Sequence, residues 1–165
     1  MASNSTESAT ANQQLIGAAQ QDSLELLDIA LKRKAQVNYI DGVKNTALHY
    51  ACQCGSPLVL EQLLLKMPEN LVYIKNVQGN TPLHLALDSK CSDELKLKLV
   101  ALLLKHNPLI LTRNKDGMTC VDLASGELKE ILQRHADNNQ RSPKKKKKNN
   151  FIDRKDVDVD DDDDK

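Results

Sequence analysis

Three segments of this sequence repeat the same order of residue types around a threonine. They are DGVKNTALHYACQCG (residues 41–55), NVQGNTPLHLALDSK (76–90) and NKDGMTCVDLASGEL (114–128). Each has Asp or Asn five residues before its Thr, Leu or Val two residues after it, and Ala five residues after it. A repeat of about 33 residues predicts a stack in which each unit buries its apolar face against its neighbours.

The residues that follow each motif predict helices. Each segment leads into leucine-rich sequence in which apolar residues recur three and four positions apart, which is the spacing of one helix face. Thr81 followed by Pro82 predicts a helix start, because proline is well tolerated at the first helical position after an N-cap. Asp22 with Glu25 three residues later resembles a capping box and predicts another start. The unit is therefore turn, helix, turn, helix.

These motifs resemble the ankyrin repeat. The resemblance is carried by TPLHLA (81–86), TALHYA (46–51) and VNYID (37–41), and the pattern extends backward through LIGAA (15–19). It implies an all-α ankyrin-repeat solenoid of stacked helix-turn-helix units with short turn fingers, spanning residues 12–137. We predict four repeats at about 12–40, 41–75, 76–113 and 114–136, with the first and last as atypical caps. The third repeat is longer by several residues around Asp88 to Glu94.

The repeated motif residues have a structural role in this family. In ankyrin repeats the histidine three residues after the Thr hydrogen-bonds backbone near the turn and connects neighbouring repeats. The resemblance assigns such a role to Thr46, His49, Thr81, Pro82, His84 and Thr119. Asp122 replaces the histidine in the last motif. A catalytic role repeated in each unit would not allow that exchange.

Opposite charges are separated along the chain. The sequence has 23 Lys and Arg against 23 Asp and Glu, of which residues 141–165 contribute nine basic and eight acidic side chains. Six of the nine basic ones lie within 141–148 and seven of the eight acidic ones within 156–164. Because blocks of like charge repel one another and bury little apolar surface, we predict a disordered charged tail at 138–165. We also predict a disordered N-terminus at 1–11.

The charged tail has two possible uses. The basic block follows Ser142 and Pro143 and has the composition of a short nuclear-localisation signal; it consists of Lys144, Lys145, Lys146, Lys147 and Lys148. A solubilising tract is the alternative interpretation. The acidic run could hold a basic client such as a ribosomal protein or a histone; it includes Asp160, Asp161, Asp162, Asp163 and Asp164. The cytoplasm, the nucleus or both are therefore the expected location.

Several function classes are disfavoured. Only four residues are aromatic, which argues against an all-β fold and against a base-stacking nucleic-acid surface. No nucleophile elbow, phosphate-binding loop or HExxH motif is present, so we expect no enzyme activity and no cofactor. Four cysteines without an evident signal peptide indicate a reducing compartment, and their spacing fits no standard zinc pattern. No apolar run approaches the length of a membrane span.

The resemblance implies a non-catalytic adaptor or scaffold that works as a monomer. In ankyrin stacks, turn tips and inner helices form a concave groove that binds a protein partner. The candidate groove positions are Val43, Asn45, Tyr50, Gln53, Val77, Gln78, Asn80, Leu85, Asp88, Ser89, Lys115, Asp116 and Met118. Among them Val43, Val77 and Met118 are candidate anchors, because an apolar residue at a turn tip gains nothing from water. The alternative function is a chaperone or escort for a basic client.

Overall fold

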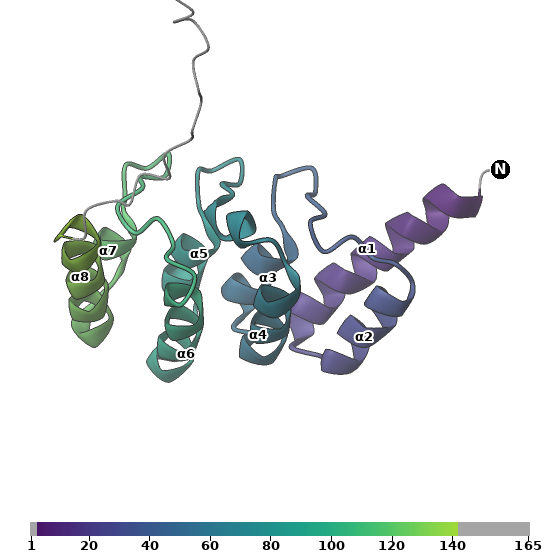
Figure 1. Ribbon diagram of the computed structural model, residues 1–165, viewed down its shortest axis with the longest axis horizontal. Coiled ribbons are helices and arrows are strands. Elements are labelled where there is room, and N and C mark those ends of the chain that lie inside the picture. Colours follow the sequence, from purple (N-terminus) through teal and green to yellow (C-terminus); the bar gives the residue numbers. More distant parts are fainter. Residues whose placement is uncertain (1–2, 142–165) are drawn as a thin grey trace, which may run out of the picture.

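The computed structural model describes residues 3–141 of the chain. In this range the chain forms helices joined by turns and loops, without a strand. The elements in order are α1 (Ser3–Gln21), α2 (Leu24–Lys32), α3 (Ala47–Cys54), α4 (Pro57–Lys66), the 3-10 helix η1 (Glu69–Tyr73), α5 (Pro82–Asp88), α6 (Asp93–Leu104), α7 (Cys120–Leu123) and α8 (Gly126–Arg141). Figure 1 shows successive helix pairs side by side, which confirms the predicted helical repeat stack.

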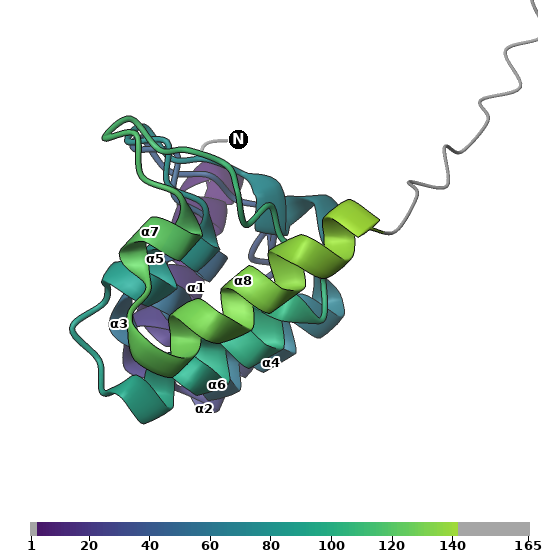
Figure 2. The ribbon, with the colours of Figure 1, turned by 90° about the vertical axis from the view of Figure 1, so that its left-hand side faces the viewer.

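The helices form two layers. The inner helices pack in succession, α1 against α3, α3 against α5 and α5 against α7, while α4 packs against α6 in the outer layer. Seen along the stack in Figure 2, the loops before α3, α5 and α7 project together at one edge. Leucines from both layers fill the space between them, and Leu48, Leu63, Leu83, Leu99 and Leu132 are fully buried. No single pair encloses this core, so each repeat depends on its neighbours.

The predicted helix starts are present, with one correction. Thr46, Thr81 and Thr119 are N-cap residues, each in a capping box with the residue three positions on. At the start of α2 the N-cap is Ser23, whose side chain accepts from the Leu26 N–H. Asp22, predicted for this role, has a positive φ of 52° and accepts a hydrogen bond from the Val59 N–H over 2.9 Å. Asp22 therefore connects the first repeat to α4 instead of capping α2.

The structure also corrects the predicted bounds of the repeat domain. The segment 1–11 was predicted to be disordered, but α1 begins at Ser3, and Ala11 and Asn12 are buried. Asn12 accepts a hydrogen bond from the Gln36 N–H, 2.8 Å away, so this helix is fastened to the loop after α2. At the other end α8 continues to Arg141, past the predicted limit of 137. Composition alone missed both extensions because helical hydrogen bonds can continue through polar sequence.

Candidate functional site

Three loops project from the stack, and we call them the fingers. Finger 1 comprises residues 41–45, finger 2 residues 76–80 and finger 3 residues 114–118. In finger 1 the Asp41 Oδ1 accepts from the N–H groups of Val43 and Asn45, at 3.0 and 2.8 Å. Asn76 and Asn114 close the other two fingers with equivalent pairs of bonds. The residue five positions before each Thr therefore folds its own finger, as Asp and Asn do in Asx turns.

Backbone hydrogen bonds join each finger to the next. The Val77 N–H donates to the Val43 carbonyl over 3.0 Å, and the Lys115 N–H donates to the Gln78 carbonyl over the same distance. The contact between fingers 2 and 3 is close enough that a Cβ on Gly79 would lie 3.0 Å from the Lys115 nitrogen. Gly79 also has a φ of 77°, which favours glycine. The fingers thus form a continuous row.

Side-chain amides reinforce that row. The Asn76 Nδ2 donates to the Asn45 Oδ1 over 3.0 Å, and the Asn114 Nδ2 donates to the Asn80 Oδ1 over 2.8 Å. Each asparagine at the start of fingers 2 and 3 therefore uses its oxygen within its own finger and its nitrogen toward the preceding one. Asp41 has no nitrogen to donate, and its second oxygen accepts from the Tyr50 hydroxyl at 2.5 Å.

The two motif histidines lie beneath the fingers and connect consecutive repeats. The Thr46 N–H donates to the His49 Nδ1 over 3.1 Å, and His49 Nε2 lies 3.1 Å from the Asn80 carbonyl oxygen. His84 repeats the arrangement with the Thr81 N–H at 3.3 Å and the Thr112 carbonyl oxygen at 3.0 Å. Since Nδ1 accepts, Nε2 must carry the proton that it donates.

Burial keeps these histidines neutral. His49 and His84 are both fully inaccessible to solvent, and this desolvation lowers the pKa of each below its ordinary value of 6.5. The hydrogen bonds to backbone carbonyls oppose this shift without cancelling it. Neutral imidazoles that accept on one side and donate on the other have a structural role in the repeat stack.

The last repeat ends this series differently. Asp122 stands at the position of the histidines and accepts from the Thr119 N–H at 2.9 Å and from the Thr119 hydroxyl at 2.7 Å. These two bonds lower the pKa of the Asp122 carboxyl. No repeat follows α8 within residues 3–141, so the side chain at this position has no carbonyl of a following repeat to which it could donate a hydrogen bond.

Most of the candidate groove positions are accessible. The three apolar fingertip residues Val43, Val77 and Met118 are 47%, 40% and 37% exposed. Gln53, Gln78, Asp88, Lys115 and Asp116 are exposed as well, and Tyr50 and Asn80 are half-buried. Together these side chains belong to the fingers and the inner helices, whose arrangement Figure 2 shows from the end of the stack.

Three candidate groove residues are buried, contrary to the prediction that they face a partner. Asn45 is held by Asn76, and Leu85 is packed in the core. Ser89 ends α5, and its hydroxyl donates to the Ala86 carbonyl over 2.7 Å. These three side chains contact the protein itself, so they are not available to a partner.

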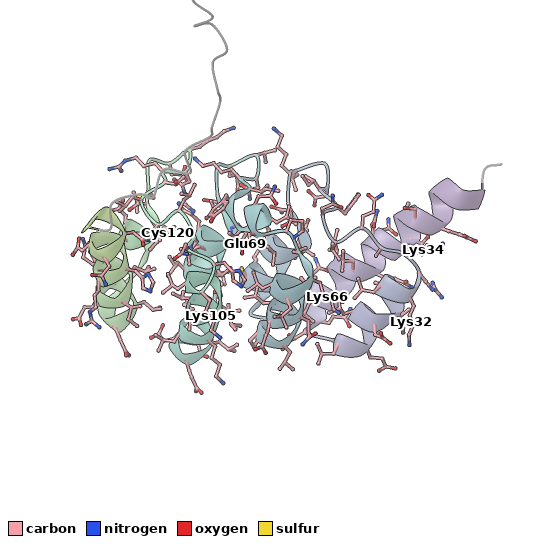
Figure 3. The ribbon with its side chains drawn as sticks, viewed as in Figure 1. Lys32, Lys34, Lys66, Glu69, Lys105 and Cys120 are labelled. Atoms are coloured by element: carbon pink, nitrogen blue, oxygen red, sulfur yellow. The ribbon has the colours of Figure 1, made fainter. Side chains whose placement is uncertain are left out.

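The four cysteines are free and fall into two classes. Cys52 and Cys120 are buried, and desolvation raises the pKa of Cys52 strongly and that of Cys120 to about 12. Figure 3 shows where Cys120 lies among the helices at the end of the stack. Cys54 is exposed and Cys91 is half-buried. Within the part of the chain that the structure describes, no three His, Cys, Asp or Glu side chains gather in a way that could hold a metal ion.

Two sets of predicted residues lie outside the described range. The candidate nuclear-localisation residues 144–148 and the acidic run 156–164 both follow Arg141, so they stay predictions. Between Ser3 and Arg141, no helix is both long and apolar enough to cross a membrane.

Comparison with known proteins finds similarity to repeat proteins. Residues 15–99 match the family described as ankyrin repeats in three copies. The chain is 36% identical over 85 residues to Inversin of Gallus gallus, which is 52% of this chain and 7% of that protein. It is 29% identical over 125 residues to the phosphocholine transferase AnkX of Legionella pneumophila, covering 70% of this chain and 13% of that protein.

A relative of similar extent is also found. The ankyrin repeat-containing protein YGL242C of Saccharomyces cerevisiae is 31% identical over 139 residues, which covers 77% of this chain and 77% of that protein. In contrast to Inversin and AnkX, of which this chain spans only a small part, the yeast protein shares most of its length with it.

Proposed function

Since the chain belongs to the ankyrin-repeat family, whose members are generally protein–protein interaction modules, we propose that it is a non-catalytic adaptor that binds a protein partner in the groove between its fingers and inner helices. The observation that carries this proposal is the row of exposed fingertip side chains on fingers held together by backbone bonds.

The rigidity of the fingers supports binding at this surface. Each finger is closed by its own Asp or Asn and bonded to the next finger through both backbone and side chain. A surface that is already ordered loses little conformational entropy when a partner binds, which leaves more of the contact energy for affinity. This arrangement distinguishes the fingers from ordinary surface loops.

The chemistry of the groove favours a partner with apolar and polar groups over a strongly charged one. Val43, Val77 and Met118 offer apolar contacts, while Gln53 and Gln78 offer amides. Charges of both signs stand close together at the tip of finger 3, where Lys115 and Asp116 are neighbours. Lys32, Lys66 and Lys105 instead lie at the ends of the outer helices, as Figure 3 shows. Cations at helix C-termini have a structural reason, because they interact favourably with the helix dipole.

Comparative capture of binding partners tests the proposal. The full chain and a fingertip variant, with Val43, Val77 and Met118 all changed to Ser, are expressed in cells as proximity-labelling baits. We expect the fingertip variant to lose the partners that the unchanged chain labels most strongly. Purified partners identified in this way are then titrated against both proteins, with at least a tenfold loss of affinity expected, or about 1.4 kcal/mol.

A matched variant on the opposite side controls for exposed apolar surface in general. Leu58 and Leu65 of α4 and Leu24 of α2 are 52%, 74% and 44% exposed, so they are at least comparable in exposure to the fingertip residues. Changing these three leucines to Ser leaves the partner set unchanged if the groove is the binding surface. Loss of partners from this variant alone would place the interaction on the outer helices and overturn the proposal.

The alternative function, a chaperone for a basic client, rests on Asp160 to Asp164. These residues lie outside the described range, so we keep this function as a prediction. Deleting residues 156–165 separates it from groove binding, because the fingers are untouched. A client that depends on the deleted segment and not on Val43, Val77 and Met118 would favour the chaperone.

A further inference from the structure

The loop between α5 and α6 places one cysteine directly on the preceding repeat. Cys91 lies in this loop, which occupies residues 89–92 and contains part of the extra length of the third repeat. A Cβ atom built on Gly55 would clash with the Cys91 Sγ. The thiol of Cys91 therefore rests on the Gly55 backbone, at the C-terminal end of α3.

Cys54 is the residue immediately before Gly55. It occupies the last position of α3 and is exposed. Since a Cα–Cβ bond is about 1.5 Å and consecutive Cα atoms lie about 3.8 Å apart, the Cys91 Sγ lies within roughly 8 Å of the Cys54 Cα. Disulfides join cysteines whose Cα atoms are about 4.4–6.8 Å apart, so the loop 89–92 must supply whatever movement brings the two Cα atoms into that range. After burial, the nearby Cys91 is the second factor that raises the pKa of the Cys54 thiol.

We propose that Cys54 and Cys91 form an oxidation site, at which a small-molecule disulfide such as oxidised glutathione converts the two thiols into a disulfide between the second and third repeats. The thiolate of one cysteine attacks a sulfur of the small disulfide and releases one glutathione thiol. The second cysteine then attacks the mixed disulfide and releases the other glutathione thiol. The protein loses two hydrogen atoms, and one molecule of oxidised glutathione becomes two reduced ones.

The other two cysteines are excluded from this chemistry by their surroundings. Cys52 and Cys120 are fully buried in the core, and burial raises the pKa of both thiols. A small-molecule disulfide does not reach a buried sulfur, so these two side chains react slowly while the stack is folded. Accessibility in the folded stack therefore determines which two cysteines react, and their order in the sequence does not.

The disulfide would cross the edge of the groove. Gln53 precedes Cys54, and Asp88 ends the helix before the Cys91 loop, and both are exposed candidate groove residues. A covalent link here joins two neighbouring repeats and closes a loop in the unfolded chain, which stabilises the folded stack. The proposal goes beyond the binding function and does not depend on it, because the crosslink can form without a partner.

Intact-mass measurement and peptide mapping of the full chain test the site. The folded, reduced protein is incubated with oxidised glutathione near pH 8, and remaining thiols are blocked before digestion. We expect the unchanged chain to lose two hydrogen atoms and to yield one crosslinked peptide pair containing Cys54 and Cys91. The thermal midpoint should rise on oxidation and return to its starting value when a reductant is added.

Single variants divide the mechanism into its steps. Cys54→Ser and Cys91→Ser each leave one accessible cysteine, and at least one of these variants should accumulate a mixed disulfide with a single glutathione. Cys52→Ala and Cys120→Ala are the matched controls and should form the same crosslink as the unchanged chain. A circular-dichroism melt of each variant establishes that it is folded before oxidation.

Two outcomes would overturn the proposal. One is that the folded, unchanged chain accumulates glutathione adducts at Cys54 or Cys91 without forming the internal disulfide. The other is that the mapped crosslink contains Cys52 or Cys120 under native conditions. The oxidation is repeated in denaturant as a reference for this second outcome. All four thiols are then accessible, so this sample shows which crosslinks form when the fold does not restrict the pairing.

Discussion

The interior junctions of the repeat stack and its two ends use different side chains at the same motif positions. Fingers 2 and 3 begin with Asn76 and Asn114, while finger 1 begins with Asp41. Likewise the second and third repeats have His49 and His84 after the motif threonine, while the last has Asp122. The carboxylates stand only at the two ends of this series.

The difference follows from hydrogen-bond donors. Asn76 accepts within its own finger and donates to Asn45 of the preceding finger, and His84 accepts from Thr81 and donates to the Thr112 carbonyl. A carboxylate accepts but has no proton to donate when ionised. Asp41 has no preceding finger and Asp122 has no following repeat within residues 3–141. A side chain that only accepts hydrogen bonds is therefore sufficient at both positions. Interior positions need a side chain that both donates and accepts hydrogen bonds, because each of these side chains connects two repeats.

The largest loss in the free energy of unfolding is expected when the aspartate found in the last repeat replaces an interior histidine. His84→Asp leaves the Thr112 carbonyl without its donor and places a carboxylate where the imidazole is fully buried. We expect a loss on the order of 4 kcal/mol in the free energy of unfolding, measured by urea denaturation. Asp122→Asn at the exposed end is the control and should cost much less. Equal losses in the two variants would contradict the distinction between interior and end.

A smaller loss is expected from the equivalent exchange in the fingers. Asn76→Asp removes the donor to the Asn45 Oδ1 and brings two oxygens together at a position that is 8% exposed. The expected cost is about 2 kcal/mol, again from the urea midpoint. The reverse exchange, Asp41→Asn, should change stability by less than about 1 kcal/mol, because no neighbouring finger depends on this side chain. If both exchanges cost the same, the finger-to-finger bond contributes little.

Lowering the pH should weaken the interior junctions. Because burial lowers the pKa of His49 and His84, these histidines stay neutral in the folded chain at pH values where they become protonated in the unfolded chain. The unfolded state then binds more protons, so the free energy of unfolding falls as the pH falls below the ordinary value of 6.5 and is fully retained above it. Urea midpoints between about pH 7.5 and 5.5 measure this slope.

A glutamine variant tests whether His49 contributes to the pH dependence of the free energy of unfolding. His49→Gln removes one of the two buried imidazoles and keeps His84, so the stability of this variant should depend less on pH than that of the unchanged chain. Asp122 contributes in a different window, since its lowered pKa removes stability only as the pH falls below its ordinary value of 3.8. An unaltered slope in His49→Gln would show that the junction made by His49 does not contribute to it.

The smallest effect is expected at finger 1, where the motif glycine is missing. Lys44 stands two residues before Thr46 with a φ of 60°, while Gly79 and Gly117 have a φ of 77° at the same position. Lys44→Gly keeps the left-handed conformation but removes the cost of holding a side chain in it, and should stabilise the protein by less than about 1 kcal/mol. Gly79→Ala should destabilise it, because the new Cβ meets the Lys115 backbone. The thermal unfolding midpoint should therefore rise in Lys44→Gly and fall in Gly79→Ala.

The helices, their starts and the order of the fingers could be predicted from sequence, because each depends on residues within a few positions of one another. The Thr46 and His49 pair is an example, since both lie in one capping box. The accessibility of groove residues was predicted less well. Leu85 packs in the core, and α5 ends at Asp88 so that the Ser89 hydroxyl bonds back to the Ala86 carbonyl. No local pattern distinguishes that helix end from one more exposed helical position.

By itself, the sequence determined the repeat, since the hydrogen bonds that close a finger or cap a helix join residues two to four positions apart. The tertiary structure decided which repeats touch through which atoms. Asn45 meets Asn76, and Cys91 rests on the Gly55 backbone, only after the helix pairs stack. Such pairs are far apart along the chain, and the loop lengths and packing of whole repeats bring them together. The extra residues around Cys91 were visible in the sequence, but their position against Gly55 required the fold.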